Sequence, residues 1–387
     1  MRTLAQLVPA LLLLFTFPFV SLGTEDSRVF SQSKQDASLR YEVEHAIDKG
    51  LKWLDGKQNP DGSWSQPEYP ALTALVLKAY MGEPMGNYRA RRPAVVENGY
   101  RYLLASVQPD GGIYSSAAPR PMENYNTAVS MVALILARDP GLEPVILKAR
   151  NYLVSLQNNG GVGYNKSGSS DLSNTVMALE ALYYSKHLVG DVARKGLDPV
   201  KKLDWQSAID FIQRCQNLPE HNPEAWASDD PKNKGGFVYS PGESKAGKDG
   251  SETGDNVPLR SYGSMTYAGL LSYIYADLDK EDPRVTAAYA WLRDNYTLDE
   301  NPGMGAQGLF YYYHTMAKAL SAYGVDRLPV PGRPEADWRR ELALRLLSLQ
   351  DGEEGSWVNE NGRWWERDPV LVTSYALIAL EIVYRGL

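Results

Sequence analysis

A glycine turn that begins with glutamine recurs along this chain of 387 residues. Four copies keep the glutamine: QNPDGSW at 58–64, QPDGGIY at 108–114, QNNGGVGY at 157–164 and QDGEEGSW at 350–357. Degenerate copies lie at 235–239 and 303–305. The stretch before each copy, for example 43–54, has apolar residues at the i, i+3, i+4, i+7 spacing of a helix with one buried face. A unit repeated in this way buries its apolar face against its neighbours, so the repeat predicts one large helical domain.

Each turn leads into a second apolar stretch, and these second stretches align on a threonine: Thr73, Thr127, Thr175, Thr266, Thr315 and Thr373. They are apolar on nearly every side, which predicts helices covered on more than one face. An open solenoid of six such hairpins would need polar end repeats, yet the segment 373–380 is strongly apolar. We therefore expect an all-α fold, an (α/α)6 toroid of six helical hairpins around a central cavity, as a single domain over 42–387.

These glutamine turns between paired helices resemble those of the terpenoid cyclase and protein prenyltransferase superfamily, which includes squalene–hopene cyclase-like proteins. The resemblance covers about residues 42–387. It implies an α/α toroid whose inner helices line a cavity, and a protein that binds, and as an enzyme would transform, an elongated apolar ligand of isoprenoid type. The 25 Tyr and 9 Trp against 7 Phe agree with a partly wet cavity, because these rings carry a polar edge.

Alternating outer and inner helices would gather the inner N-termini at one mouth of the cavity. Unpaired N–H groups and helix dipoles there would favour a carboxylate or an anionic head group. Two helix starts share a pattern, ENYN at 123–126 and DLSN at 171–174. Glu123 and Asp171 are therefore candidate catalytic carboxylates for acid–base work or cation stabilisation, with helix capping as the alternative. Candidate ligand-binding residues at this mouth are Tyr125, Asn126, Asn174, Arg260, Tyr262 and Tyr313.

The sequence differs from the cyclases at the motif that supplies their proton donor. Cyclases of this superfamily carry Asp-x-Asp-Asp-Thr-Ala at an inner-helix start, and their central Asp is held protonated to attack an alkene. Aligned on Thr175, this sequence keeps the first acid as Asp171 but has Ser173 and Asn174 where the other two acids belong. Neither replacement can protonate a carbon–carbon double bond, so the resemblance does not extend to class II cyclisation by that site.

The comparison with prenyltransferases fails at the metal. The segment 313–315, Tyr-His-Thr, resembles the one that supplies the histidine zinc ligand in prenyltransferase β subunits. Where their Asp and Cys ligands precede an inner helix, this chain has Arg-Ser-Tyr at 260–262. We therefore expect no metal site and no cofactor. His314 remains a candidate catalytic residue, as a base or hydrogen-bond donor, with a structural buried histidine as the alternative.

Three further polar features need an explanation. The polar insertion 217–259 delivers the chain to the fourth inner helix and is expected to be a lid or a disordered segment. Lys78, Glu180 and Lys318 fall within apolar second helices, where they must line the cavity or form a salt bridge. The segment 359–368 combines two tryptophans with alternating charge, as a ligand platform or as a turn that closes the ring.

The first residues have the pattern of an export signal. Arg2 precedes an apolar stretch at 4–20, and small residues lie before a cut after Gly23. A retained membrane anchor is the alternative. We expect a signal peptide over 1–23, a flexible lead-in over 24–41, no stable membrane span after cleavage, and export to the bacterial periplasm or the medium.

The composition limits the classes of molecule that this chain is expected to bind. The formal net charge is −7 without a basic cluster, which argues against nucleic acid. The single cysteine, Cys215, excludes an intramolecular disulfide. The expected partner is an apolar small molecule, whereas the oligomeric state and the question of catalysis stay open. A non-catalytic scaffold and a carbohydrate-active toroid are the alternative functions.

Overall fold

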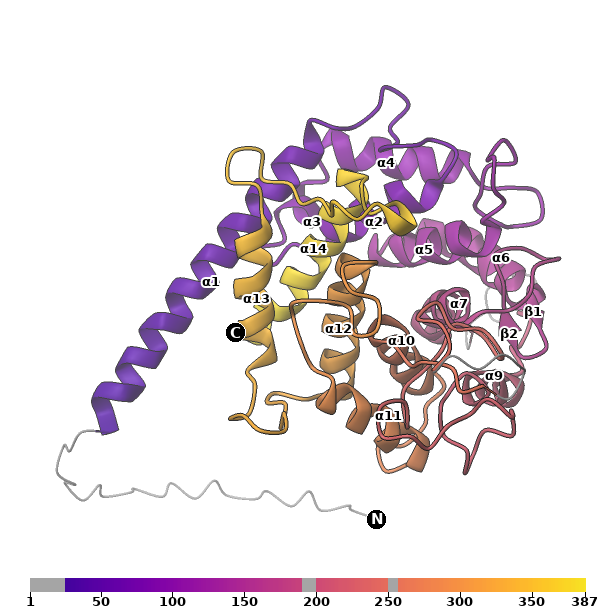
Figure 1. The fold of residues 1–387 in the computed structure, drawn as a ribbon. Coiled ribbons are helices and arrows are strands. Elements are labelled where there is room, and N and C mark those ends of the chain that lie inside the picture. Colours follow the sequence, from indigo (N-terminus) through magenta and orange to yellow (C-terminus); the bar gives the residue numbers. More distant parts are fainter. Residues whose placement is uncertain (1–24, 190–199, 250–256) are drawn as a thin grey trace, which may run out of the picture.

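The computed structural model describes residues 25–189, 200–249 and 257–387, and the expected signal segment 1–23 lies outside these ranges. The described chain is mostly helical (Figure 1). The inner helices are α2 (Pro70–Gly82), α5 (Glu123–Leu136), α7 (Leu172–Tyr184), α10 (Gly263–Tyr275), α12 (Leu309–Tyr323) and α14 (Pro369–Tyr384). The outer helices are α1 (Glu25–Asp55), α4 (Ala94–Ala105), α6 (Glu143–Ser155), α9 (Trp205–Gln213), α11 (Pro283–Asp294) and α13 (Trp338–Leu349). Short elements between them are α3 (Asn87–Arg91), η1 (Pro140–Leu142), β1 (Gln157–Asn158), β2 (Gly161–Val162), α8 (Lys186–Val189) and η3 (Arg363–Trp365).

The inner helices form a closed ring. Each packs against the next in chain order, from α2 through α5, α7, α10 and α12 to α14, and α14 packs back against α2. Every residue of α2 from Pro70 to Met81 is buried, as expected for a helix covered on all sides. An outer helix buries one face instead, as α4 does with Val96, Tyr100 and Leu103. The expected all-α toroid is confirmed.

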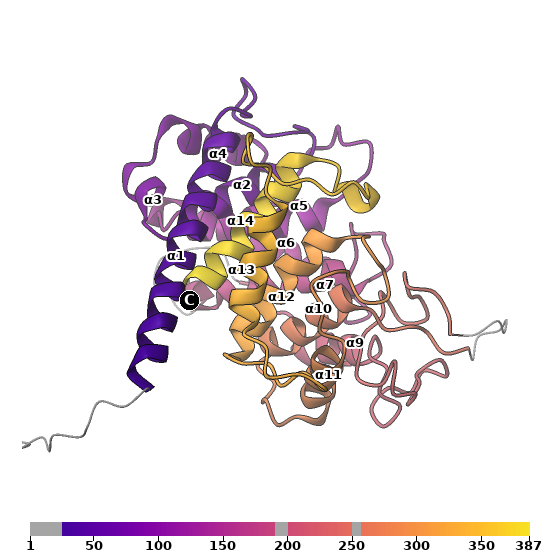
Figure 2. The same cartoon turned by 60° about the vertical axis from the view of Figure 1, so that its left-hand side comes forward.

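Several turn glutamines tie one hairpin to the next. The Gln58 side-chain amide donates within its own turn and also to the carbonyl of Val95 in α4, at 2.8 Å. In the last turn, Gln350 donates to the carbonyl of Gly355 at 2.8 Å and to that of Ala46 in α1 at 3.0 Å. The α1 helix accordingly lies beside α13 and α14 in both views (Figures 1 and 2). The last hairpin therefore closes on the first.

The aligned threonines join each turn to its inner helix. Five of them accept a backbone N–H from the end of the turn at 2.9 or 3.0 Å, namely Thr73, Thr127, Thr175, Thr266 and Thr373. The Trp64 indole donates to the carbonyl of Leu54 at 2.8 Å and so anchors the turn to the preceding helix. Gly62 has a φ of 90°, and a Cβ there would lie 2.5 Å from the Asn98 carbonyl oxygen. The repeat therefore encodes a hairpin joint that needs these residue types.

The fourth turn contains a glutamine that the sequence analysis missed. Gln216 donates to the carbonyl of Gly235 at 3.0 Å and to that of Arg284 in α11 at 2.9 Å, which is the same pattern. The polar insertion begins directly after this glutamine and separates it from the glycine of the turn. A search for the repeat that allowed an insertion between the glutamine and the glycine would have found Gln216.

The first helix begins earlier than the apolar pattern indicates. We expected a flexible lead-in over 24–41, but α1 begins at Glu25. Arg40 donates to the carbonyls of Tyr384 and Leu387, and Asp36 pairs with Arg340 at 3.1 Å. These polar contacts, together with the buried side chain of Leu39, hold residues 36–40 of the helix against the ring. No helix within the described ranges combines the length and the apolar character that crossing a bilayer requires.

Candidate functional site

A cavity of about 590 Å³ lies at the N-terminal ends of the inner helices. Every inner helix lines it with a residue from its first two turns: Leu72, Tyr125, Met177, Met265, Tyr311 and Tyr375. The six threonine-marked helix starts therefore border one hollow, as the ring predicts. Its volume lies within the range typical of small-molecule sites.

The walls of this cavity are largely aromatic. The Tyr125 and Tyr375 hydroxyls are 2.9 Å apart, and the ring of Tyr311 lies 5.9 Å from that of Tyr375. At the other side the ring of Tyr69 meets Trp365 edge-on at 4.6 Å. Burial raises the pKa of Tyr125 to about 12, so its hydroxyl keeps its proton. Such walls suit an apolar ligand with a few polar contacts.

Four of the predicted site residues line the cavity: Tyr125, Asn126, Asn174 and Tyr262. Asn126 accepts a hydrogen bond from the Ala71 backbone N–H at 3.0 Å through its side-chain oxygen. Asn174 uses both ends of its amide, since it donates to Asp171 at 2.9 Å and accepts from Asn124 at 3.2 Å. Their roles in binding a ligand stay predictions.

The two candidate carboxylates do not line this cavity. Glu123 accepts a hydrogen bond from the hydroxyl of Tyr152 in α6 at 2.9 Å. Asp171 is the N-cap of α7 and accepts from the Ser173 hydroxyl at 2.6 Å and from the Asn174 backbone N–H and side chain, each at 2.9 Å. Burial raises the pKa of Asp171, although these donors oppose the rise. In this structure Asp171 has the contacts of a helix cap.

The other three predicted residues also lie outside the cavity lining. The Tyr313 hydroxyl donates to the Leu298 carbonyl, and Tyr311 lines the cavity instead. Residues two apart on a helix point about 200° apart, so only one of them can face the axis. Arg260 is 54% exposed and lies 3.9 Å from Asp249. His314 is buried, with its ring 5.0 Å from that of Tyr375.

His314 is held neutral. Burial lowers its pKa well below the usual histidine value, and Lys318 and Lys78 lower it further. Within the ranges that the structure describes, its Nδ1 has no hydrogen-bond partner. Across the same ranges, no three His, Cys, Asp or Glu side chains come together as a metal site would require.

Side chains already accept hydrogen bonds from backbone N–H groups at the starts of α2, α7, α10, α12 and α14, which corrects the expectation of free N–H groups there. Glu366, which sequence analysis did not single out, accepts from the backbone N–H of Tyr311 at 2.8 Å and of Phe310 at 3.3 Å. It also accepts from the Asn359 amide at 2.6 Å. Burial raises the pKa of Glu366, and these donors oppose the rise. Because Trp364 and Trp365 line the cavity as well, the segment 359–368 both closes the ring and borders the site.

A buried ion triad joins three of the inner helices, further along each helix than its residues that line the cavity. Glu180 of α7 accepts from Lys318 of α12 at 2.7 Å and from Lys78 of α2 at 3.4 Å, and all three side chains are at most 11% exposed. The alternative of a salt bridge is thus the correct one. Burial alone would raise the pKa of Glu180, but the two ammonium groups outweigh it and lower the pKa to about 2. The triad lies one to two helical turns beyond the lining residues, or about 5–10 Å.

The described part of the insertion borders the cavity. Tyr239 and Lys245 line it, and the nitrogen of Lys245 lies 4.1 Å from the centre of the Tyr239 ring. Asn217 donates to the Leu259 carbonyl at 2.8 Å, which joins the two ends of the insertion. Residues 250–256 lie outside the described ranges, so the prediction of a lid or a disordered segment remains a prediction.

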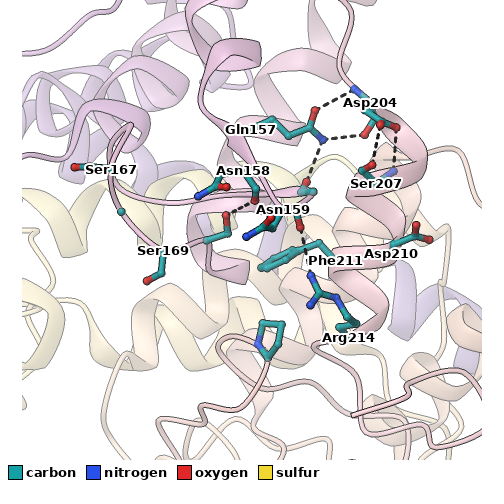
Figure 3. Close-up of a pocket in the computed structure, with 14 residues that line it drawn as sticks. Gln157, Asn158, Asn159, Ser167, Ser169, Asp204, Ser207, Asp210, Phe211 and Arg214 are labelled. Atoms are coloured by element: carbon teal, nitrogen blue, oxygen red, sulfur yellow. Dashed lines mark hydrogen bonds between the residues drawn. The ribbon is translucent and has the colours of Figure 1, made fainter.

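A second pocket, of about 890 Å³, lies on the surface between β1, β2 and α9 (Figure 3). Its polar groups largely bond to one another. The Gln157 amide donates to the Asp204 backbone carbonyl at 2.8 Å, and the Asp204 carboxylate accepts from the Ser207 backbone N–H at 3.0 Å. The aromatic ring in it, Phe211, is buried in the core. These groups serve the hairpin joint, so we place the candidate site in the axial cavity.

No family model matches the chain. Solved structures do match it. A variant of the type II terpene cyclase MstE from Scytonema, in complex with its product merosterolic acid A, is 13% identical, covers 91% of this chain and 99% of its own, and has a TM-score of 0.55. Another variant, in complex with its substrate geranylgeranyl dihydroxybenzoate, is 12% identical, covers 91% of this chain and 100% of its own, and has a TM-score of 0.55.

A GH76 alpha-mannanase from Bacteroides thetaiotaomicron also matches, at 12% identity and a TM-score of 0.52, covering 87% of this chain and 95% of its own. At such low identity these likenesses concern the fold alone. The chain has the helical toroid fold that type II terpene cyclases share.

Proposed function

We propose that this chain binds an elongated apolar molecule of isoprenoid type in the axial cavity. The observation that carries the proposal is the cavity itself: it is bordered by all six inner helices and lined mainly by aromatic and aliphatic side chains. A scaffold that needs no ligand would have its axis filled with side chains at this level.

The neighbouring folds support an isoprenoid ligand. The two MstE structures hold a geranylgeranyl aromatic substrate and a merosterolic acid product. Burial of a chain against apolar walls contributes about 0.8 kcal/mol per methylene group, or about a fourfold gain in affinity. Affinity should therefore rise with chain length until the cavity is full.

We propose binding rather than proton-initiated cyclisation as the activity of this site. Glu366 is the carboxyl group among the described lining residues, and Asp171 lies next to the lining residues Ser173 and Asn174. Each already accepts hydrogen bonds from three donor groups, which serve helix starts. An acid that protonates an alkene has to be neutral and must also direct its proton at the ligand. Burial raises the pKa of both carboxyl groups, but their oxygens are already occupied by these donors.

Tryptophan fluorescence tests the proposal, because Trp364 and Trp365 border the cavity. Titration with polyprenyl alcohols of increasing length should change the emission and raise the melting temperature, while mass spectrometry recovers the alcohols unchanged. Met177→Trp fills the cavity and should abolish binding. Leu104→Trp adds the same ring on the outer face of α4, where Leu104 is 37% exposed, and should leave binding intact. Equal binding by both variants would refute the axial cavity as the site.

We further propose that residues 1–23 are an export signal that is cleaved after Gly23. The support is the sequence pattern alone. Mass spectrometry of the protein recovered outside the cytoplasm should give Thr24 as the first residue. A full-length chain in the membrane fraction would favour the retained anchor instead.

A carbohydrate ligand is the second candidate. It is supported by the likeness to the GH76 alpha-mannanase and by Trp364, an indole that borders the cavity and is 42% exposed. Tyrosine and tryptophan rings can stack on sugar faces as well as on prenyl chains. Titration with neutral oligosaccharides under the same fluorescence assay separates the two candidates.

A further inference from the structure

Two buried polar groups in the cavity wall are unused. Among the described residues that line the cavity, the side-chain nitrogen of Asn126 and the hydroxyl of Tyr311 have no hydrogen-bond partner in the described parts of the chain. Buried polar groups are normally paired, and each exception calls for a reason. At the wall of a cavity, the simplest reason is a ligand atom that completes the hydrogen bond.

The contacts of Asn126 fix what it can offer to a ligand. Its side-chain oxygen accepts from the Ala71 backbone N–H at 3.0 Å, so a flipped amide would place two donors against each other. The unused atom is therefore the NH₂ group, a donor that has no acceptor. Asn126 is only 1% exposed, so bulk water cannot serve this donor freely.

The charges around the cavity exclude an ionised ligand group at this depth. Among the described lining residues, the charged ones are Glu366, Lys245 and Arg120. Glu366 accepts hydrogen bonds from the start of α12, and Lys245 forms an ion pair with Glu243. Arg120 is exposed at the rim. An anionic head beside Asn126 would lose its hydration without gaining a buried counter-charge, which is costly.

Resting on the proposed function, we propose that the ligand carries an uncharged oxygen acceptor, such as a ketone, ester or ether, that accepts a hydrogen bond from the Asn126 amide. Tyr311 supplies a second free donor from α12, which lies opposite α5 in the ring order. The ligand class is an elongated apolar chain with neutral oxygen, not a diphosphate or a carboxylate held within the cavity.

The test compares three probes of one skeleton: farnesylacetone, the hydrocarbon with CH₂ in place of the carbonyl, and the corresponding carboxylate. The wild-type protein should bind the ketone about three- to tenfold more tightly than the hydrocarbon, as one hydrogen bond provides. The carboxylate should bind most weakly. This comparison needs no variant, so it remains decisive if a variant fails to fold.

Two variants then locate the contact. Asn126→Ala removes the donor without adding a charge, so the ketone should lose its advantage over the hydrocarbon. Met177→Leu changes an apolar part of the wall and should leave the ratio of the two affinities unchanged. Equal affinity of wild type for ketone and hydrocarbon overturns this inference alone, as does tightest binding of the carboxylate with dependence on Arg120. Failure of all three probes to bind overturns the proposed function as well.

Discussion

Replacing Glu180 with Gln should be among the most destabilising single changes in the ring. The substitution keeps the shape but leaves the Lys78 and Lys318 ammonium groups without a buried carboxylate. At an effective dielectric constant of about 20, contacts of 3.4 and 2.7 Å correspond to about 5 and 6 kcal/mol of attraction. Desolvation of the charges offsets much of this, and breaking a buried pair typically costs about 3–5 kcal/mol. We expect a loss of that size in the free energy of unfolding.

Urea denaturation at neutral pH measures this loss. The control is Glu220→Gln, because Glu220 forms an exposed pair with Lys234 and its removal should leave stability unchanged within error. Burial lowers the pKa of Lys318 from its usual value of 10.5. Glu180 opposes this lowering, so its removal should lower the pKa of Lys318 further. The folded variant then binds fewer protons than the folded wild type, and the deficit of the variant should shrink as the pH rises toward 10.5. A loss below about 1 kcal/mol would refute the triad as a buried, coupled unit.

Three further predictions concern other buried contacts. Thr127→Val should cost about 1–3 kcal/mol by stranding the Ile113 N–H, whereas Thr127→Ser should restore most of it, as measured by urea denaturation. Gln350→Ala should lower the thermal midpoint more than Gln108→Ala, because Gln350 bonds to both its own turn and α1, whereas Gln108 bonds within its own turn and the adjoining Ser106; equal shifts would contradict ring closure by this contact. Burial raises the pKa of Glu381 far above 4.5, so the folded state holds a proton that the unfolded chain releases and stability falls as the pH rises from about 4.5. Glu381→Gln should flatten that fall in a pH series of unfolding curves, and an unchanged slope would assign it to other groups.

The repeated sequence motifs were sufficient to predict the architecture. The glutamine turns and the threonine-marked helices specify a joint with defined hydrogen bonds, which five of the threonines make. Six hairpins with one-sided outer and all-round apolar inner helices can satisfy their burial by closing into a ring. The position of the cavity at the inner N-termini follows from that topology. For the same reason Tyr125, Asn126, Asn174 and Tyr262, which lie at inner-helix starts, were predicted at the mouth and do line the cavity.

The sequence pattern could not predict which way each side chain points or which group it bonds to. Tyr311 and Tyr313 are both tyrosines at the start of α12, and nothing in the sequence distinguishes them. The rotation of α12 within the ring places Tyr311 in the cavity and directs the Tyr313 hydroxyl to the Leu298 carbonyl. Glu366 belongs to the sixth hairpin but caps the fifth inner helix, a contact 55 residues apart in the chain. No local signal marks such a pairing.

The sequence by itself determined the repeat unit, the helix classes and the closed ring, because each of these depends on spacing along the chain. Only the tertiary structure decided which charges neutralise one another, which helix starts are already capped and which donors are left for a ligand. The physical reason is that burial and hydrogen-bond satisfaction depend on what lies across the ring, and those neighbours are brought together only when the last hairpin meets the first.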